Sequence, residues 1–100
     1  MKEQEGGEHP SYVMPSQVLR SDVDGQMVLL DLASETYFGL DEVGAHMVTL
    51  LLEQPFDDAV ANLLDIYDGD PLVLRRDLDA LVERLVSAGL LERAGDRGPG

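Results

Sequence analysis

The sequence of 100 residues sets 7 Lys and Arg against 20 Asp and Glu, a formal net charge of −13 at pH 7. A chain of this charge repels phosphate backbones and anionic membrane surfaces, so nucleic-acid and membrane binding are disfavoured. It contains no Cys, which excludes disulfides and thiolate metal sites. No apolar run reaches the ~18 residues of a membrane helix, and the polar start MKEQEGGEH lacks the apolar core of a signal peptide. We therefore expect a cytoplasmic domain, whose 44% hydrophobic residues are too many for a disordered chain.

Both ends of the chain have the composition of tails. Residues 1–11 and 94–100 are rich in Gly, Pro and charged side chains and show no periodic apolar pattern. The composition therefore predicts two disordered tails around one folded domain, residues 12–93. A domain of this size is small but lies within the range that folds alone.

Three short strands are predicted in the first half of the domain. Gln17–Asp22 and Met27–Leu32 are β-prone and flank the turn segment Val23–Gln26, which contains an Asp-Gly pair. Asp and Gly tolerate the positive φ of tight hairpin turns, so this pair predicts a hairpin. After a polar break, Thr36–Leu40 is a third β-prone run. The pattern predicts a three-stranded antiparallel sheet with one face to bury.

Three helices are predicted in the second half. Apolar residues recur at helical spacing within Glu42–Glu53, Asp58–Tyr67 and Pro71–Ala88. Asp41 is a favoured N-cap residue directly before the first of these, and Asp70 precedes the proline that begins the third. Three antiparallel strands followed by three helices predict an α+β domain shaped like a winged helix-turn-helix, a shape that does not define a function.

The sequence contains no set of residues at the spacing of a catalytic or metal site. His9 lies in a predicted tail and His46 in the first predicted helix, with no Cys in the chain to pair with. The acidic clusters Asp22–Asp24 and Asp65–Asp70 lack the further ligands of a calcium loop, and turn and cap roles account for them. There is no phosphate-binding glycine loop. We therefore expect no enzyme activity, no cofactor and no bound metal.

The third predicted strand, Thr36–Leu40, is expected at an edge of the sheet, beside the third predicted helix. An unpaired edge can accept a strand from a peptide, which gains main-chain hydrogen bonds there and side-chain selectivity from an adjoining groove. The alternative is that the edge is short and covered by the rest of the chain. The pattern alone leaves both interpretations open.

Three segments carry a pattern that extends over residues 17–91: Gly25–Asp31 (GQMVLLD), Thr36–Ala45 (TYFGLDEVGA) and Asp77–Leu91 (DLDALVERLVSAGLL). Together and in this order they resemble the PqqD-like family, the leader-peptide-binding RiPP recognition elements. The pattern is most similar to the stand-alone B1 proteins of lasso-peptide gene clusters. The Leu-Asn pair that usually follows the third strand in this family is Leu40-Asp41 here, a change that keeps the N-cap.

The resemblance implies a non-catalytic adaptor. Such proteins hold the leader of a ribosomally made precursor as an extra antiparallel strand on their third strand, with leader side chains in a cleft against the third helix. In lasso pathways the partner is B2, a transglutaminase-like cysteine protease that removes the leader before an ATP-dependent cyclase closes the ring. Lasso leaders commonly carry a Tyr-x-x-Pro element. The net charge of −13 adds the expectation that a leader with several basic residues is steered to this protein.

Carried onto this sequence, the resemblance places the leader site on one strand and one helix face. The strand-pairing residues are Glu35, Thr36, Tyr37, Phe38, Gly39 and Leu40. The cleft-facing helix positions are drawn from Val73, Arg76, Asp77, Ala80, Leu81 and Arg84. Tyr37 and Gly39 alternate with Phe38 and Leu40, which are expected to face the core. The two arginines of the helix set either receive leader carboxylates or are ordinary surface charges.

The segment Tyr12–Pro15 (YVMP) has the Tyr-x-x-Pro spacing of the leaders. The simpler interpretation is an ordinary entry into the first strand. The alternative is that this segment occupies the cleft of its own chain or of a second copy.

Two other functions remain open. A PqqD protein proper would present a peptide to a radical-SAM enzyme in the same structural way. A winged-helix nucleic-acid binder belongs to a different class, and the charge argues against it: the basic residues of the third helix, among them Arg76 and Arg84, alternate with acids such as Asp77 and Glu83.

Overall fold

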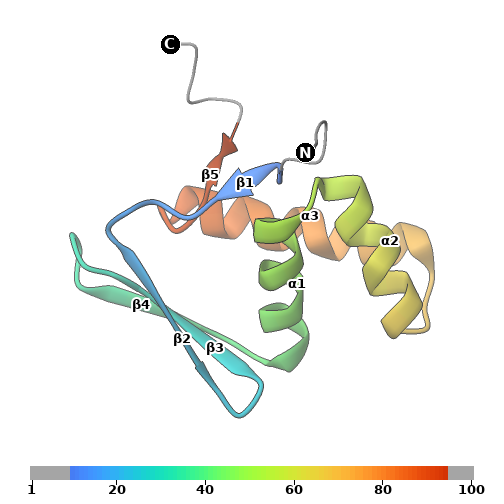
Figure 1. The fold of residues 1–100 in the computed structure, drawn as a ribbon, viewed down its shortest axis with the longest axis horizontal. Helices are drawn as coiled ribbons and strands as arrows, with labels where there is room; N and C mark the ends of the chain where they lie inside the picture. Colours follow the sequence, from blue (N-terminus) through green and yellow to red (C-terminus); the bar gives the residue numbers. More distant parts are fainter. Residues whose placement is uncertain (1–9, 95–100) are drawn as a thin grey trace, which may run out of the picture.

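The computed structural model describes residues 10–94, drawn as a ribbon in Figure 1, and residues 1–9 and 95–100 of the predicted tails lie outside this range. In chain order the elements are β1 (Tyr12–Val13), β2 (Val18–Val23), β3 (Gln26–Asp31), β4 (Thr36–Leu40), α1 (Glu42–Glu53), α2 (Phe56–Ile66), α3 (Pro71–Ser87) and β5 (Glu92–Arg93). All three helices lie to one side of the sheet formed by β2, β3 and β4 (Figure 1). The predicted α+β architecture, three antiparallel strands followed by three helices, is confirmed.

The three-stranded sheet has the order β2-β3-β4, and both strand pairs are antiparallel. The pairing of β2 with β3 ends at Val23 opposite Gln26, so the hairpin turn consists of two residues, Asp24 and Gly25. Their φ angles are 52° and 82°, the left-handed values that this tight turn requires. The turn is shorter than the predicted four residues because the ladder continues to the last residue on each side.

The helices begin where a cap or a proline favours it. The Asp41 carboxylate accepts a hydrogen bond from Gly44 N at 2.8 Å, and that of Asp70 accepts one from the N–H two residues later at 2.9 Å. The second helix begins at Phe56, two residues earlier than predicted, because Pro55 with its φ of −59° leads directly into it without a side-chain cap. No helix within residues 10–94 is both long and apolar enough to cross a membrane.

The core lies between one face of the sheet and the helices. Met27 and Leu29 are 1% and 0% exposed, because alternate residues of a central strand share one face. The fully buried side chains that meet them come from the helices and from the segment after α3: Val48, Leu51, Leu63, Leu78, Leu85 and Leu91. Asp31 is also buried, and its carboxylate accepts a hydrogen bond from Ala33 N at 2.9 Å, which fixes the turn leading into β4.

A second, two-stranded sheet joins the two ends of the described chain. β1 and β5 pair side by side, with Tyr12 opposite Arg93 (Figure 1). Ser11 and Ala94, both expected in the tails, extend this contact, since Ala94 N donates to Ser11 O at 2.9 Å. The Ser11 hydroxyl also accepts a hydrogen bond from Phe56 N at 2.9 Å, which ties the N-terminal segment to the start of α2. Strands of two residues show no alternation, so the sequence does not predict this sheet.

Candidate functional site

β4 forms one edge of the three-stranded sheet. It pairs with β3 only, and within residues 10–94 no strand lies along its other side. Its position at an edge is therefore confirmed. Such an edge presents unpaired backbone N–H and C=O groups, which can pair with an extended peptide.

The side chains of β4 alternate between the core and the outside. Leu40 is 7% exposed and belongs to the core, and Phe38, opposite the buried Leu29, is half-buried against it. Tyr37 is 76% exposed, and it and Gly39 face away from the helices. Phe38 and Leu40 thus face the core, as the sequence predicts.

The turn before β4 determines where the exposed edge begins. Glu35 has a φ of 60°, and its backbone N–H donates to Asp31 O at 2.7 Å. Thr36 is exposed, and its hydroxyl lies 2.7 Å from that of Ser34. These contacts close the β3–β4 turn locally and leave the following residues extended.

A groove lies between β4 and the C-terminal half of α3. Phe38 forms its strand side, and the guanidinium of Arg84 lies over the Phe38 ring with Cζ 5.1 Å from the ring centroid, a cation–π contact. The groove is open to solvent, has a volume of about 580 Å³, and is lined by Phe38, Glu83, Arg84, Ser87 and Ala88. The structure thus brings together one predicted strand residue and one predicted helix residue.

The other predicted helix positions are distributed differently. Val73, Arg76, Asp77 and Ala80 are exposed along α3 but do not line this groove. Leu81 is 9% exposed and packs in the core, because the core side of α3 is made by its neighbours Leu78, Val82 and Leu85.

Three lining residues were missed by the sequence reasoning: Glu83, Ser87 and Ala88. Ser87 and Ala88 are three and four residues after Arg84, the spacing that places helix residues on one face. Continuing the predicted face by one turn would have found them.

The arginines of α3 have different surroundings. Arg75 donates to the Asp57 carboxylate at 2.9 Å and lies over the Phe56 ring at 5.1 Å, so it is bound to α2. Within residues 10–94, neither Arg76 nor Arg84 forms a salt bridge with a carboxylate. Arg84 therefore presents its cationic group to the groove.

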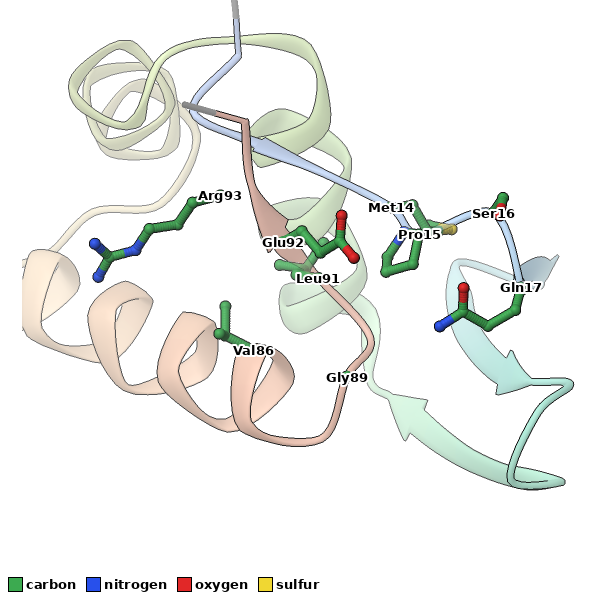
Figure 2. Close-up of a pocket in the computed structure, with 9 residues that line it drawn as sticks. All are labelled: Met14, Pro15, Ser16, Gln17, Val86, Gly89, Leu91, Glu92 and Arg93. Carbon is green, nitrogen blue, oxygen red and sulfur yellow. The ribbon is translucent and has the colours of Figure 1, made fainter. Parts of the chain in front are cut away.

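A larger hollow lies on the other side of the turn after α3 (Figure 2). Its volume is about 920 Å³, and it is lined by Met14, Pro15, Ser16, Gln17, Val86, Gly89, Leu91, Glu92 and Arg93. In Figure 2 the residues of the β1–β2 connection stand on one side and those of β5 on the other. Among residues 10–94, this lining includes one hydroxyl side chain, that of Ser16, and no His or Cys.

The segment Tyr12–Pro15 does not occupy the β4–α3 groove of its own chain. Tyr12 and Val13 form β1, and Met14 and Pro15 line the hollow of Figure 2. The hypothesis that it fills its own cleft is wrong, because backbone pairing with β5 holds it elsewhere. In the structure the segment instead forms β1 and leads into β2.

Metal-ligating side chains do not gather in the described part of the chain, where no group of three or more His, Cys, Asp or Glu could hold an ion. His46 is half-buried, and its Nδ1 lies 3.3 Å from the Tyr67 hydroxyl. The two rings meet edge to face at 5.8 Å, a packing contact between α1 and the end of α2. The contacts of His46 in the structure are thus packing contacts between α1 and the end of α2.

Comparison with known proteins gives one family and two similar structures. The family described as coenzyme PQQ synthesis protein D (PqqD) matches residues 26–91, which include β4 and all of α3. No curated protein sequence matches the chain.

The similar structures are described as complexes with leader peptides. "TbiB1 in complex with the TbiA(beta) leader peptide" shares 33% identity at a TM-score of 0.76, over 80% of this chain and 94% of that one. "Lasso peptide synthetase B1 complexed with the leader peptide" shares 28% identity at a TM-score of 0.76, over 82% and 98%. The fold of this chain is thus similar over nearly the full length of both proteins.

Proposed function

Because this chain belongs to the PqqD family of RiPP recognition elements, we propose that it binds the leader peptide of a lasso-peptide precursor. The observation that carries this proposal is the edge of β4, along which no further strand of residues 10–94 lies, beside the groove that Phe38 and Arg84 line. An edge offers hydrogen bonds to an extended backbone, and an adjoining groove selects side chains, the two requirements of binding by strand addition. The leader peptides named in both similar structures support the same assignment.

The leader is proposed to add to β4 as an antiparallel fourth strand along Glu35–Leu40. Alternate leader side chains then point to the same side as Phe38, into the groove against α3. A Tyr or Pro of a Tyr-x-x-Pro element suits this groove, because the Phe38 ring provides an apolar, aromatic wall. The exposed positions Val73, Arg76, Asp77 and Ala80 lie toward the N-terminus of the same helix and are proposed as further contacts of a longer leader.

The charges around the groove suit a leader of mixed sign. Arg84 lines the groove and is proposed to donate to a leader carboxylate, and Arg76, about two helical turns toward the N-terminus of α3, is proposed to do the same. Glu83, also in the groove lining, is proposed to accept from a leader Lys or Arg. The net charge of −13 steers a basic leader toward the whole protein.

We propose that the protein is an adaptor and not an enzyme. Within the described part of the chain, the groove lining contains a single hydroxyl, that of Ser87, and no His or Cys to activate it. The chemistry then falls to partners, a leader peptidase of the B2 type and an ATP-dependent cyclase, to which the adaptor delivers the bound precursor.

A PqqD protein that serves a radical-SAM enzyme is the alternative that the family description favours. It predicts the same edge and the same groove, but a different precursor. Calorimetric titrations with a lasso leader and with a leader from a radical-SAM cluster distinguish the two by which peptide binds.

The proposal is tested by calorimetric titration of the protein with a synthetic leader from the precursor gene beside its own. We expect a Kd in the micromolar range or tighter, about −8 kcal/mol. Leaders N-methylated at successive positions lose a backbone donor one at a time. Strand addition predicts a loss of binding at alternate positions only, because every second N–H faces β4. Equal tolerance of N-methylation at every position contradicts this mode of binding.

A further inference from the structure

The three-stranded sheet has a second edge, which β2 forms. Within residues 10–94, β2 pairs with β3 only, and no strand lies along its other side. With six residues, β2 is as long as the central strand and longer than β4. An extended peptide therefore meets two edges on this protein, and backbone hydrogen bonding alone does not select between them.

The register identifies the backbone groups that the β2 edge offers. Leu32 N donates to Gln17 O at 2.9 Å, which places residue 17 in a hydrogen-bonded pair at the start of the β2–β3 ladder. Bonded and non-bonded pairs alternate along an antiparallel ladder, so the backbone groups of Val18, Arg20 and Asp22 point to the free edge. A strand added to β2 would bond to these three residues.

The side chains behind the two edges differ. Toward the helices, β4 presents the half-buried Phe38 and the buried Leu40, so a strand added there covers apolar surface. On β2 the corresponding side chains are those of Arg20 and Asp22, and Arg20 lies in register with the buried Leu29. A strand added to β2 would thus place every second side chain beside a charged group.

The two charges of β2 are held in place by hydrogen bonds. Arg20 Nε donates to the Asp22 carboxylate at 3.0 Å, and Arg20 Nη2 donates to the Thr49 hydroxyl of α1 at 3.0 Å. That hydroxyl donates in turn to Ala45 O at 2.9 Å, which anchors the contact to the α1 backbone. The side chains of Arg20, Asp22 and Thr49 are named here the β2 cluster.

The charges of the β2 cluster are paired and still hydrated. The Arg20 and Asp22 side chains are 33% and 54% exposed. A strand along β2 would cover both, and the incoming chain would have to replace the lost water contacts with hydrogen bonds of its own. Charged residues that point inward are one means by which proteins prevent pairing at an edge strand. β4 itself contains no charged residue.

We propose that the β2 cluster closes the second edge of the sheet and thereby restricts strand addition to β4. The proposal rests on the leader-binding function proposed above and deepens it, because Arg20 and Asp22 then determine where on the sheet an extended peptide binds. It implies one leader for each adaptor. The two charges cancel, so the edge is closed without reducing the net charge of −13 that attracts a basic leader.

The test replaces the two charges by residues that suit an open edge. Arg20→Val/Asp22→Val gives β2 apolar inward side chains like those of β4, leaves the net charge unchanged and keeps a high strand propensity. The ¹⁵N-labelled protein is titrated with the synthetic leader, and amide shifts and hydrogen exchange are followed strand by strand. In the wild type we expect one bound leader and no shift of Val18–Val23 when β4 is saturated.

The variant is expected to bind a second leader along β2. This leader should bind about ten- to a hundredfold more weakly than the first, because backbone hydrogen bonds hold it without the groove of Phe38 and Arg84. Hydrogen exchange should slow at the amides of residues 18, 20 and 22 and not at 19 and 21, because only the first three point to the edge. Two variant chains that pair along β2 slow the same amides and have the same meaning. Affinity at β4 should stay within about twofold.

Arg75→Val/Asp57→Val is the matched control. It removes an ion pair of similar length, 2.9 Å, that joins α3 to α2 away from the sheet, and it also leaves the net charge unchanged. It should bind one leader and leave the β2 amides unaffected. The milder Arg20→Thr/Asp22→Thr keeps β-branched residues in the strand and takes the place of the valine variant if that variant misfolds.

Three results overturn the proposal: a leader along β2 of the wild type, a single leader with unchanged β2 exchange in both β2 variants, or a second leader along β2 of the control. Wild-type β4 amides that do not respond to the leader contradict the proposed function instead. In that case a synthetic copy of Gln26–Asp31, the antiparallel neighbour of β2, replaces the leader as the added strand. It should then bind along β2 of the variants and not of the wild type, and equal binding or no binding to all of them overturns the proposal.

Discussion

The third helix carries two arginines that make the same contact with opposite consequences. Arg75 and Arg84 each lie 5.1 Å from the centroid of a phenylalanine ring, that of Phe56 for the first and Phe38 for the second. Arg75 also donates to Asp57 at 2.9 Å and joins α3 to α2. Arg84 lines an open groove beside the sheet edge.

The role of an arginine that packs on a phenylalanine ring therefore depends on the other groups around its guanidinium. Around Arg75 the chain supplies the anion as well as the ring, so the pair links two helices. Around Arg84 the described residues supply the ring and leave the guanidinium without a carboxylate. We interpret the first pair as a structural contact and the second as a preformed half of a binding site.

The largest expected effect comes from the core side of α3, the helix that carries both arginines. Leu78 of α3 is 0% exposed, and Leu78→Ala leaves a cavity in the core. The free energy of unfolding should fall by about 2–5 kcal/mol, measured by guanidinium chloride denaturation. Leu72→Ala, at a site 74% exposed, should change it by less than about 0.5 kcal/mol. Similar values for the two variants would mean that α3 is not held by this core.

Replacing each phenylalanine by alanine distinguishes the roles of the two arginine–phenylalanine pairs. Phe38→Ala removes the strand wall of the groove and should weaken leader binding at least about tenfold in calorimetry. Phe56→Ala should leave leader affinity within about twofold, because this ring lies at the start of α2. Both rings are half-buried, so both variants should lose about 1–3 kcal/mol of stability. A leader that binds Phe38→Ala normally does not use this groove.

The arginines themselves give a smaller effect. Arg84→Ala should weaken binding of a leader with an acidic residue by about tenfold, because Arg84 is exposed and the effect lies near the lower end of the about 1.5–3 kcal/mol of a hydrogen bond to a charged group. Arg84→Lys should retain part of that affinity, because it keeps the charge and loses the planar donor pair. Arg75→Ala is the matched control and should bind the leader unchanged. An equal loss in Arg75→Ala would show that only the overall charge matters.

The smallest expected effect concerns the anion beside Arg75. Asp57→Asn removes the ion pair, in which the two side chains are 49% and 79% exposed. Exposed pairs contribute little, so thermal denaturation should reveal a loss of no more than about 1 kcal/mol, and leader affinity should not change. A larger loss of stability would show that the Arg75 pair is a stronger link between α2 and α3 than its exposure suggests.

The sequence predicts the central elements because each has a local signal. Asp24-Gly25 marks the hairpin, and Asp41 and Asp70 cap two helices, each by a contact within a few residues. The β1–β5 sheet has no such signal: Tyr12 pairs with Arg93 across nearly the whole chain, and two-residue strands carry no periodicity.

The candidate site is predictable in part for the same reason. β4 and its alternation follow from a local pattern, whereas the face of α3 that meets β4 depends on how the helix is rotated about its axis. That rotation places Leu81 in the core and not in the cleft, whereas Ser87 and Ala88 follow Arg84 at helical spacing and could have been found by continuing the predicted face.

The central claim is that a leader peptide binds along β4 and against Arg84, and NMR titration of the ¹⁵N-labelled protein with the synthetic leader tests it most directly. We expect shifts of the backbone amides of Thr36–Leu40, slower hydrogen exchange along that edge, and a shift of the Arg84 Nε–H signal. The Arg75 Nε–H signal should stay in place and serve as the internal control. Shifts centred on β2 or on Arg75, or no shift at a saturating concentration of leader, would contradict the account.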